Sequence, residues 1–553
     1  MKSRTLFFNP TVLKKNITRF APVWALYSVM LLMITVIMAD DASYYARNLA
    51  ECLMPFALVN FFYAPLCAML LFGDLYNSRM CNALHAMPLR RETWFATNVL
   101  SGFLFAIVPN ALMALISFLL VDGIFAIPLV FWLGCTMQYI FFFGTAVLAA
   151  FCVGNRFAMS LVYLIINGFS LILYWLTEKL YSGALYGVIY QEDIFYTFSP
   201  VIKMVSEFEY LHVTKWGTWY FSDGWGYMGI CVALGIGCFA LALHAYRRRN
   251  LECAGDFIAI PWLSPIFLVL YTLCGGACCH GFFSLFVGEE SYFFLILGFV
   301  IGFFTGKMLL ERTVRVFRKK TFLGFGIFIL VFCITLLGAY VDVLGIVRWV
   351  PKAGQVKGVN ISNGISYYTD YDMPLLTDPQ HIEDILGIHQ YGIENRDEGN
   401  DGLEGTRFYI SYVMKNGAVR QRVYNLNYET DAGRSVGCYM SRPELVLGKI
   451  YTGQWIPEEI IVWDLRITDP EDVRSLVDAI IADCLAENLS QNWYYTEGSD
   501  YTFWMEITCD AGDDLNGYQS LKCSSFAENT VTWLETHEEY SEEWEKMKAE
   551  YVK

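Results

Sequence analysis

The sequence predicts a polytopic α-helical membrane protein of about nine transmembrane helices, followed by an acidic α+β domain. The chain has 553 residues, of which 56% are hydrophobic and only 17% are charged, so it does not read as a soluble globular protein. The charge also changes sign along it. Residues 1–342 carry 22 Lys and Arg against 18 Asp and Glu, whereas residues 343–553 carry 17 against 36, a net charge of −19. Two differently solvated parts therefore share one chain.

Residues 1–19 are predicted to form a cytoplasmic interfacial helix. Asn9-Pro10 is a good helix start, because Asn caps a helix and Pro suits its first position. Basic residues alternate behind it with an apolar stripe, which is typical of a helix lying on the membrane surface. The apolar run that begins near Phe20 lacks a small-residue cleavage site, so it should stay as an anchor and not be removed as a signal peptide.

Apolar runs long enough to cross about 30 Å of hydrocarbon recur along the first part of the chain. A charge at the centre of such a run would cost about 2.5 to 3.5 kcal/mol on insertion scales. Lys307 lies near the end of its run, where it can reach water or pair with Glu311. We expect a six-helix core in residues 20–246 and three additional helices in residues 247–342. The predicted spans are 20–39, 53–73, 94–121, 127–151, 157–177, 226–246, 258–279, 291–310 and 321–341.

The distribution of basic residues predicts the orientation. With the N-terminus in the cytoplasm, 17 Lys and Arg fall in cytoplasmic segments and four in external loops. Nine spans then place residues 343–553 outside the cytoplasm. The predicted localisation is the cell (plasma) membrane, as a multi-pass protein with a cytoplasmic N-terminus and an extracytoplasmic C-terminal domain.

A short polar stretch, residues 74–94, separates two long apolar runs. If it is helical, four apolar side chains share one stripe. Pro88 then turns the chain, and Arg90 and Arg91 suit a return to the cytoplasmic face. A helix under the bilayer with an apolar stripe and no lipid to cover it needs a protein partner. The stripe consists of Tyr76, Met80, Leu84 and Met87.

Residues 343–553 are long enough for one α+β core. Lys415-Asn416-Gly417 predicts a hairpin turn, because Asn-Gly tolerates the positive φ that such a turn requires. Asp378-Pro379 predicts the start of a helix. The predicted strands are 356–362, 408–414, 419–426 and 460–465, and the predicted helices are 378–394, 470–487 and 535–548.

The cysteines do not define a site. Twelve of the 16 lie in the membrane part without a CxxC pair, which is typical of small apolar packing residues. Four lie in the polar part and allow three disulfide pairings, among which the sequence does not choose. These four are Cys438, Cys484, Cys509 and Cys523.

A catalytic or metal site is not predicted. The phosphate-binding pattern GxxxxGK[ST] is absent, since the stretch 302–308 is one residue short and lacks the Ser or Thr. The stretch 537–541 fails the HExxH pattern at its last position. Cys278-Cys279-His280 suits either a metal or, more simply, packing at a helix end. A membrane enzyme would need indispensable polar side chains such as His280, and these are scarce.

The stretch Asn82–Glu92, Asn-Ala-Leu-His-Ala-Met-Pro-Leu-Arg-Arg-Glu, resembles the cytoplasmic loop of ABC-2-type transporter permeases. In that family a short coupling helix ends in a Leu-Pro-x-x-Arg-like turn and binds the ATP-binding subunit. Met87 stands where Leu is usual, and Asp74 where Glu commonly begins the loop. The resemblance extends over the first six predicted spans. The remaining spans and the outer domain are similar to additions found in a subset of bacterial permeases.

The resemblance implies a non-catalytic permease subunit of an ATP-driven transporter, with export as the expected direction. The chain would need no cofactor, because ATP and Mg would bind the partner ATP-binding subunit. The other partners would be a second permease chain, in a homo- or heterodimer, and the lipid bilayer, with no nucleic acid. The residues implied in coupling are Asp74, Tyr76, Arg79, Met80, Leu84, His85, Met87, Pro88, Arg90 and Arg91.

Alternatives remain at several of these positions. The arginines of the loop suit acidic groups of a partner or simple anchoring at the cytoplasmic face, and His85 suits a hydrogen bond to the partner or a structural role. The acidic outer domain would attract cationic peptides or capture an extracellular ligand, or else owe its charge to solubility. A second function is a membrane-anchored sensor that binds a ligand outside without transport. The sequence leaves the substrate open.

Overall fold

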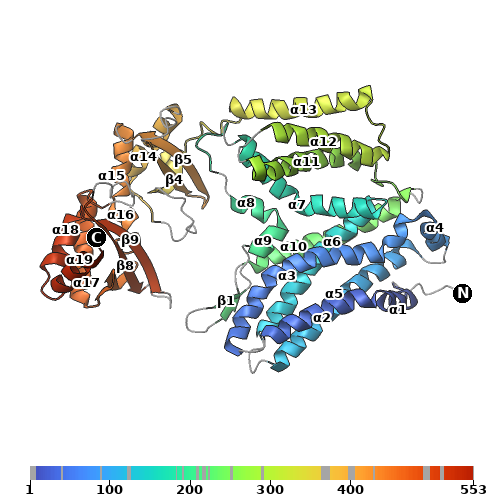
Figure 1. Cartoon of the computed structure of the whole chain (residues 1–553), viewed down its shortest axis with the longest axis horizontal. Coiled ribbons are helices and arrows are strands. Elements are labelled where there is room, and N and C mark those ends of the chain that lie inside the picture. Colours follow the sequence, from blue (N-terminus) through green and yellow to red (C-terminus); the bar gives the residue numbers. More distant parts are fainter. Residues whose placement is uncertain are drawn as a thin grey trace. The chain divides into compact units, whose positions relative to one another are not determined.

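The computed structural model divides into two compact units (Figure 1). The first unit contains Met1–Lys179 and Gln191–Cys333, and the second contains Leu180–Tyr190 and Ile334–Lys553. The second unit therefore starts earlier than the predicted boundary after residue 342 and includes a loop segment from between two helices. The structure describes residues 8–38, 42–86, 90–120, 126–181, 184–189, 192–206, 211–213, 219–221, 224–249, 253–287, 292–362, 374–395, 405–427, 430–489, 499–510 and 516–551.

Eight helices within the described residues are long and apolar enough to cross a membrane, which indicates a membrane protein. They account for the second to ninth predicted spans. The helices are α3 (Ala42–Leu71), α5 (Arg91–Leu120), α6 (Ala126–Cys152), α7 (Arg156–Tyr181), α10 (Trp225–Arg248), α11 (Leu263–Val287), α12 (Tyr292–Glu311) and α13 (Lys319–Tyr340). Lys307 pairs with Glu311 at 3.1 Å, as predicted.

The first predicted span differs from the others. It falls on α2 (Ala21–Met38), which qualifies as a span only when joined to α1 (Pro10–Arg19), and the two helices are bent by 62°. Asn9 caps α1 as predicted, since its Oδ1 accepts from the backbone N–H groups of Thr11 (3.0 Å) and Val12 (3.2 Å). The described residues thus contain eight helices long and apolar enough to span a membrane, or nine if the bent pair is counted as one span.

Buried polar side chains join the helices of the first unit. Asn60 on α3 donates from Nδ2 to Gln138 Oε1 on α6 (3.0 Å), and the Tyr27 hydroxyl lies 2.9 Å from Asn110 Oδ1 on α5. Gln138 in turn donates to the Leu53 carbonyl (2.9 Å). Polar groups buried inside a membrane are costly unless they are paired. These bonds therefore fix the positions of α2, α3, α5 and α6.

Glycines bring α11 and α12 into close contact. A Cβ atom added to Gly298 would lie 2.6 Å from the Gly275 carbonyl oxygen, and one added to Gly302 would lie 3.2 Å from Thr272 Cα. Gly298, Gly302 and Gly306 are spaced four residues apart, so they share one face of α12. This small-residue pattern is visible in the sequence.

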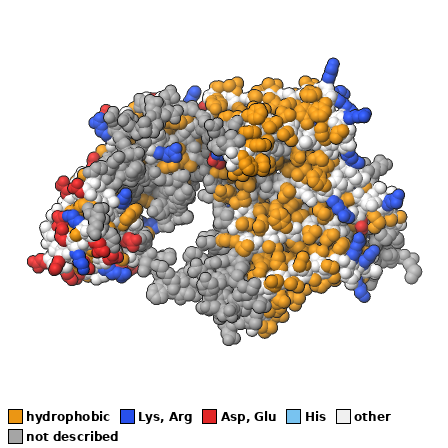
Figure 2. All heavy atoms as spheres, in the orientation of Figure 1, with side chains coloured by type: hydrophobic (Ala, Val, Ile, Leu, Met, Phe, Trp, Pro, Cys, Tyr) orange, Lys and Arg blue, Asp and Glu red, His pale blue; other side chains and the backbone are white. Residues whose placement is uncertain are grey.

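Charge and apolar surface separate clearly on the first unit. Figure 2 shows a broad apolar flank on it and a group of Lys and Arg side chains at the end that carries α4 (Ser78–Ala86). Apolar side chains on α13 are exposed, as expected for a helix surrounded by lipid; they include Leu323 (66%) and Ile334 (59%). The loop after α7 adds α8 (Glu192–Thr197), α9 (Pro200–Ser206) and a pair of strands, β1 (Leu211–Val213) and β2 (Trp219–Phe221).

The second unit contains a β-α-β-β-α arrangement twice, with one extra short strand, β7, in the second copy. The first module consists of β3 (Val356–Ser362), α14 (Pro379–Glu394), β4 (Gly405–Met414), β5 (Val419–Asn427) and α15 (Asp431–Met440). The second consists of β6 (Ile456–Val462), β7 (Leu465–Ile467), α17 (Pro470–Leu485), β8 (Thr502–Asp510), β9 (Asn516–Ser524) and α18 (Glu528–Thr536). The antiparallel sheet orders are β3-β4-β5 and β7-β6-β8-β9.

Details of register support this equivalence. Both first strands change register at the same place, between Val356 and Gly358 in β3 and between Pro457 and Glu459 in β6. Leu376 pairs with Val359 as Ile467 pairs with Ile460. The sequence Thr-Asp-Pro follows in both modules, and its aspartate caps the next helix, Asp378 at 2.8 Å from Gln380 N and Asp469 at 2.9 Å from Glu471 N.

Each module has its own apolar core. Val359, Ile385 and Phe408 are buried in the first, and their equivalents Ile460, Leu476 and Phe503 are buried in the second. The short helix α16 (Pro443–Val446) contributes Leu445 to the first core and Val446 to the second. The two modules thus share packing through α16.

Several predicted elements of this unit are confirmed. The strand 356–362 and the Asn416-Gly417 hairpin are present, with Gly417 at φ +81°.

Other elements of the second unit were predicted wrongly or were missed. The predicted strand 460–465 instead spans a hairpin turn. Trp463 adopts a positive φ of +52°, and the chain reverses there between β6 and β7. The helix 535–548 is divided between α18 and α19 (Ser541–Tyr551), because His537 is extended. Strands β8 and β9 were not predicted.

The four cysteines of this unit, whose pairing the sequence left open, are all free thiols. Cys484, Cys509 and Cys523 are buried in the second core. They therefore act there as small apolar side chains.

Candidate functional site

The predicted coupling stretch begins with a tight turn and not with a helix. After α3, residues Gly73–Tyr76 form the 3₁₀ turn η1, and α4 starts only at Ser78. Asn77 separates the two, and its Oδ1 accepts from Arg79 N (3.0 Å), which caps α4. Tyr76 therefore does not belong to the same helix as Met80.

The inner side of this stretch is held by an aromatic cluster. Phe72 is fully buried against Trp94 (5.5 Å between ring centroids) and Phe151 (5.1 Å). Tyr246 packs against both of these rings, at 5.7 and 5.0 Å. Leu75 and Cys81 are also buried, with 1% and 3% of their surface exposed. The turn and one face of α4 are thus fixed to the ends of α5, α6 and α10.

Arg249 and Arg156 complete this anchoring, although the sequence suggested only that they mark the cytoplasmic side. Arg249 follows α10 and donates to the carbonyl of Leu75 (3.4 Å) and to that of Ala150 (3.4 Å). The Arg156 guanidinium lies against Gly73, where an added Cβ would meet its Nη2 at 3.3 Å. Sequence alone cannot separate arginines that contact their own chain from solvated ones, because both occur near the ends of apolar runs.

Burial raises the pKa of the Tyr76 phenol, an effect that Arg249 and Arg156 oppose. Burial also lowers the pKa of Arg249. The Tyr76 hydroxyl itself is buried. Tyr76 therefore stays protonated and belongs to the interior of this corner, although its ring is partly exposed.

The outer side of α4 is open. Met80 is 46% exposed, and Arg79 and Arg90 are exposed as well. Arg91 is different, because its Nη1 donates to the carbonyls of Tyr246 (3.2 Å) and Arg249 (3.3 Å). Of the predicted contact residues, Arg79, Met80 and Arg90 thus face outward and Arg91 is engaged within the chain. Asp74 is half-buried in η1.

The other predicted residues of the stretch are not characterised by the structure. Leu84 and His85 lie in α4, but their side chains are outside the described part of the chain. Met87 and Pro88 fall outside the described residues altogether. The Leu-Pro-x-x-Arg-like turn stays a prediction.

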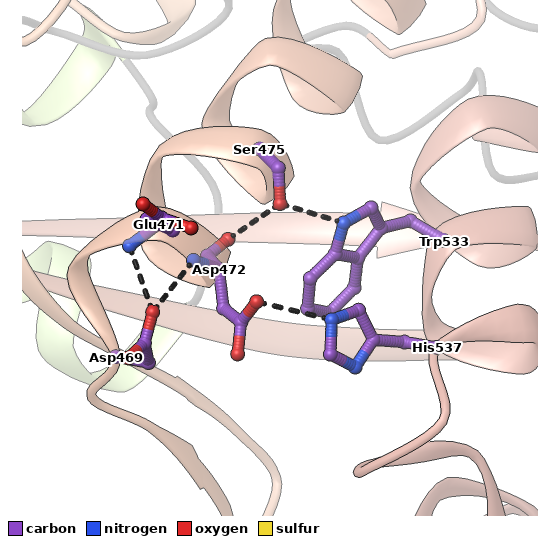
Figure 3. Close-up of polar contacts among 6 residues, drawn as sticks. All are labelled: Asp469, Glu471, Asp472, Ser475, Trp533 and His537. Carbon is purple, nitrogen blue, oxygen red and sulfur yellow. Dashed lines mark hydrogen bonds and ion pairs between the residues drawn. The ribbon is translucent and has the colours of Figure 1, made fainter.

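A second group of polar residues looks catalytic in composition. His537 Nε2 lies 3.0 Å from Asp472 Oδ1, and Ser475 lies nearby on the same helix as Asp472 (Figure 3). The Ser475 hydroxyl, however, donates to the Asp472 carbonyl (3.0 Å) and accepts from Trp533 Nε1 (2.9 Å). The serine is thus not paired with the histidine as a nucleophile with its base would be. The group instead joins the start of α17 to the end of α18.

The Cys278-Cys279-His280 stretch also fits packing. Cys278 is exposed, whereas His280 is 5% exposed and its ring lies 5.0 Å from that of Trp175. Among the residues that the structure describes, no three metal-binding side chains of His, Cys, Asp or Glu lie together.

Comparisons of the chain with family models, with curated proteins and with solved structures gave no match.

Proposed function

We propose that the chain is the non-catalytic transmembrane permease subunit of an ATP-driven, ABC-type transporter, and that α4 transmits movement from a separate ATP-binding subunit. The observation that carries this proposal is the two-sided character of α4. Its inner side is buried at Cys81 and follows the turn η1, which Arg249 holds through the Leu75 carbonyl, while its outer side exposes Met80 and Arg79. A helix that is rigid behind and open in front suits the transfer of force from a partner.

The position of α4 supports the same function. It lies at the end of the helical unit where Lys and Arg gather, which the positive-inside rule assigns to the cytoplasm. An ATP-binding subunit is cytoplasmic, and ATP and Mg would bind there. Exposed Met80 and neighbouring Arg79 offer the apolar and charged contacts typical of the centre of a protein interface. Transport by such a protein requires two permease chains around one pathway, and we propose export as its direction.

The test is affinity purification of the tagged full-length chain from its native host in mild detergent. We expect the wild type to recover an ATP-binding protein and the Met80→Glu variant to lose it. Val314→Glu is the matched control, because Val314 is also an exposed apolar residue (73%) beside a basic segment. Loss in Met80→Glu but not in Val314→Glu supports α4 as the contact. Equal recovery in all three contradicts it.

The second candidate is a membrane-anchored sensor that binds a ligand through the second unit without transport. The second unit supports it, because both of its modules have an apolar core of their own, as an independent binding domain would. Failure to recover any ATP-binding protein with the wild type, under conditions that preserve known transporter complexes, favours the sensor.

A further inference from the structure

A short segment after α7 binds the edge of the first module. Residues 184–189, here called the strap, belong to the second unit. Val188 forms an antiparallel bridge with Arg422 of β5, and the Val423 N–H donates to the Gly187 carbonyl (3.0 Å). The strap thus adds a short stretch of pairing to the outer edge of the β3-β4-β5 sheet.

The strap is seated on the ring of Tyr424. Gly187 adopts a φ of +75°, and a Cβ atom added there would lie 2.5 Å from Tyr424 Cε1. A Cβ atom added to Gly392 on α14 would lie 2.9 Å from Cγ of the same ring. Tyr186 packs edge-on to it, with 5.7 Å between centroids. The Tyr424 ring therefore occupies space that is open only because Gly187 and Gly392 have no side chain, and Gly187 belongs to the strap.

The segment that follows α13 reaches the same strand. The Asp342 carboxylate accepts from the N–H groups of Ile346 (2.6 Å) and Val347 (3.1 Å), which orders this turn. Arg422 Nη2 then donates to the Ile346 carbonyl (3.1 Å), and its guanidinium lies 5.3 Å from the centroid of the Trp349 ring. Arg422 thus contacts two chain segments, each of which follows a membrane-length helix. Its backbone pairs with the strap after α7, and its side chain contacts the segment after α13.

The second module has none of these features at its equivalent positions. Cys523 stands where the first module has Tyr424, and Asp483 stands where it has Gly392. Leu521 replaces Arg422. In the residues that the structure describes, the second module forms the same arrangement with no segment paired to the outer edge of β9, so the strap is an addition to the fold and not a requirement for it.

We propose that the strap is a releasable latch that controls how the second unit is tethered to the membrane helices. When it is seated, the segments after α7 and α13 are both held at Arg422. When it leaves, the segment after α7 is free, and the chain connection after α13 remains. In the described part of the chain the strap pairs with β5 through one bridge, whereas β4 and β5 pair at nine positions. It should therefore open locally at a lower free energy than the module unfolds. This inference does not depend on transport.

Hydrogen–deuterium exchange on the full-length chain in detergent tests the latch, with fragmentation that resolves the Val423 amide. In the wild type we expect this amide to exchange about tenfold or more faster than the amides of β4, because its acceptor is on the strap. Gly187→Ala should raise its rate by a further tenfold or so, since alanine is strained at this φ and clashes with Tyr424. Gly453→Ala is the matched control. Gly453 has a similar φ of +71° but nothing within 4 Å of an added Cβ.

Three outcomes overturn the proposal. Exchange of Val423 at the same rate as β4 in the wild type means that the strap opens only when the module unfolds. Faster exchange throughout β4 and α14 in Gly187→Ala, but not in Gly453→Ala, makes the strap an integral part of the core. No change in Gly187→Ala means that the strap is not seated on Tyr424.

Discussion

Asp483 on α17 accepts two hydrogen bonds from Thr530 on α18, one from its backbone N–H (2.7 Å) and one from its hydroxyl (2.6 Å). The same carboxylate accepts from the backbone and side-chain nitrogens of Asn529, at 2.9 and 2.8 Å. Both Asp483 and Thr530 are fully buried. One side chain of α17 thus provides the partners that the first turn of α18 lacks within its own helix.

Asp483→Ala should therefore detach the start of α18. The substitution leaves buried donors without an acceptor, at a cost of about 3 to 5 kcal/mol. Hydrogen–deuterium exchange of residues 528–536 in the full-length chain measures the effect. The control is Asp478→Ala, since Asp478 is exposed on the same helix. Equal protection of α18 in both variants would show that Asp483 does not hold this helix.

The first module should lose stability in mild acid because of His389. Its Nδ1 lies 3.0 Å from the Tyr412 hydroxyl, and burial, followed by the nearby charge of Arg422, lowers its pKa from 6.5 to about 3. The unfolded chain binds a proton below about pH 6.5 that the folded module does not bind until about pH 3. Stability is therefore complete above pH 6.5 and falls as the pH decreases through this window. At pH 5 the loss should be about 2 kcal/mol.

The measurement compares thermal unfolding of the full-length chain in detergent at pH 7.5 and pH 5. The matched variant combines His389→Ile with Tyr412→Phe, because the second module has Ile480 at the position of His389 and remains well packed there. The variant should show a smaller shift between the two pH values than the wild type. Identical shifts would contradict the role of His389.

Arg249→Lys should loosen α4 without removing the charge. Lysine cannot reproduce the forked contacts to Leu75 and Ala150, so the turn η1 and α4 should lose protection against hydrogen–deuterium exchange several-fold. Arg248→Lys is the control, because Arg248 is exposed. If transport depends on α4 as proposed, Arg249→Lys should also reduce substrate-stimulated ATP hydrolysis in the assembled complex. Unchanged protection of residues 73–86 would refute the anchoring role.

Gly298→Ala should weaken the contact between α11 and α12. The new methyl group would lie 2.6 Å from the Gly275 carbonyl oxygen, so the helices must separate, at a cost of about 1 to 3 kcal/mol. The melting temperature of the chain in detergent should fall. Gly281→Ala serves as the control, because an added Cβ there meets nothing within 4 Å. A similar change in both variants would mean that the close approach is not maintained in detergent.

The sequence by itself determined the membrane-length helices, the charge division and the start of α1 at Asn9-Pro10. These depend on local properties, since hydropathy, net charge and helix caps are set by neighbouring residues. The Asn416-Gly417 hairpin followed for the same reason. Thr-Asp-Pro also occurs twice in this part of the sequence, but three residues do not specify a repeated module, which depends on the strand registers around them.

Tertiary structure alone decided which arginines of the basic runs contact their own chain and which are exposed. Arg91 and Arg249 bind carbonyls, whereas Arg79 and Arg90 face outward, and no local pattern distinguishes them. It likewise decided that Val188 reaches Arg422, far along the chain, and that Tyr424 lies between Gly187 and Gly392. Such pairs form because the backbone brings distant segments within a few ångströms, and that distance depends on the packing of the whole unit.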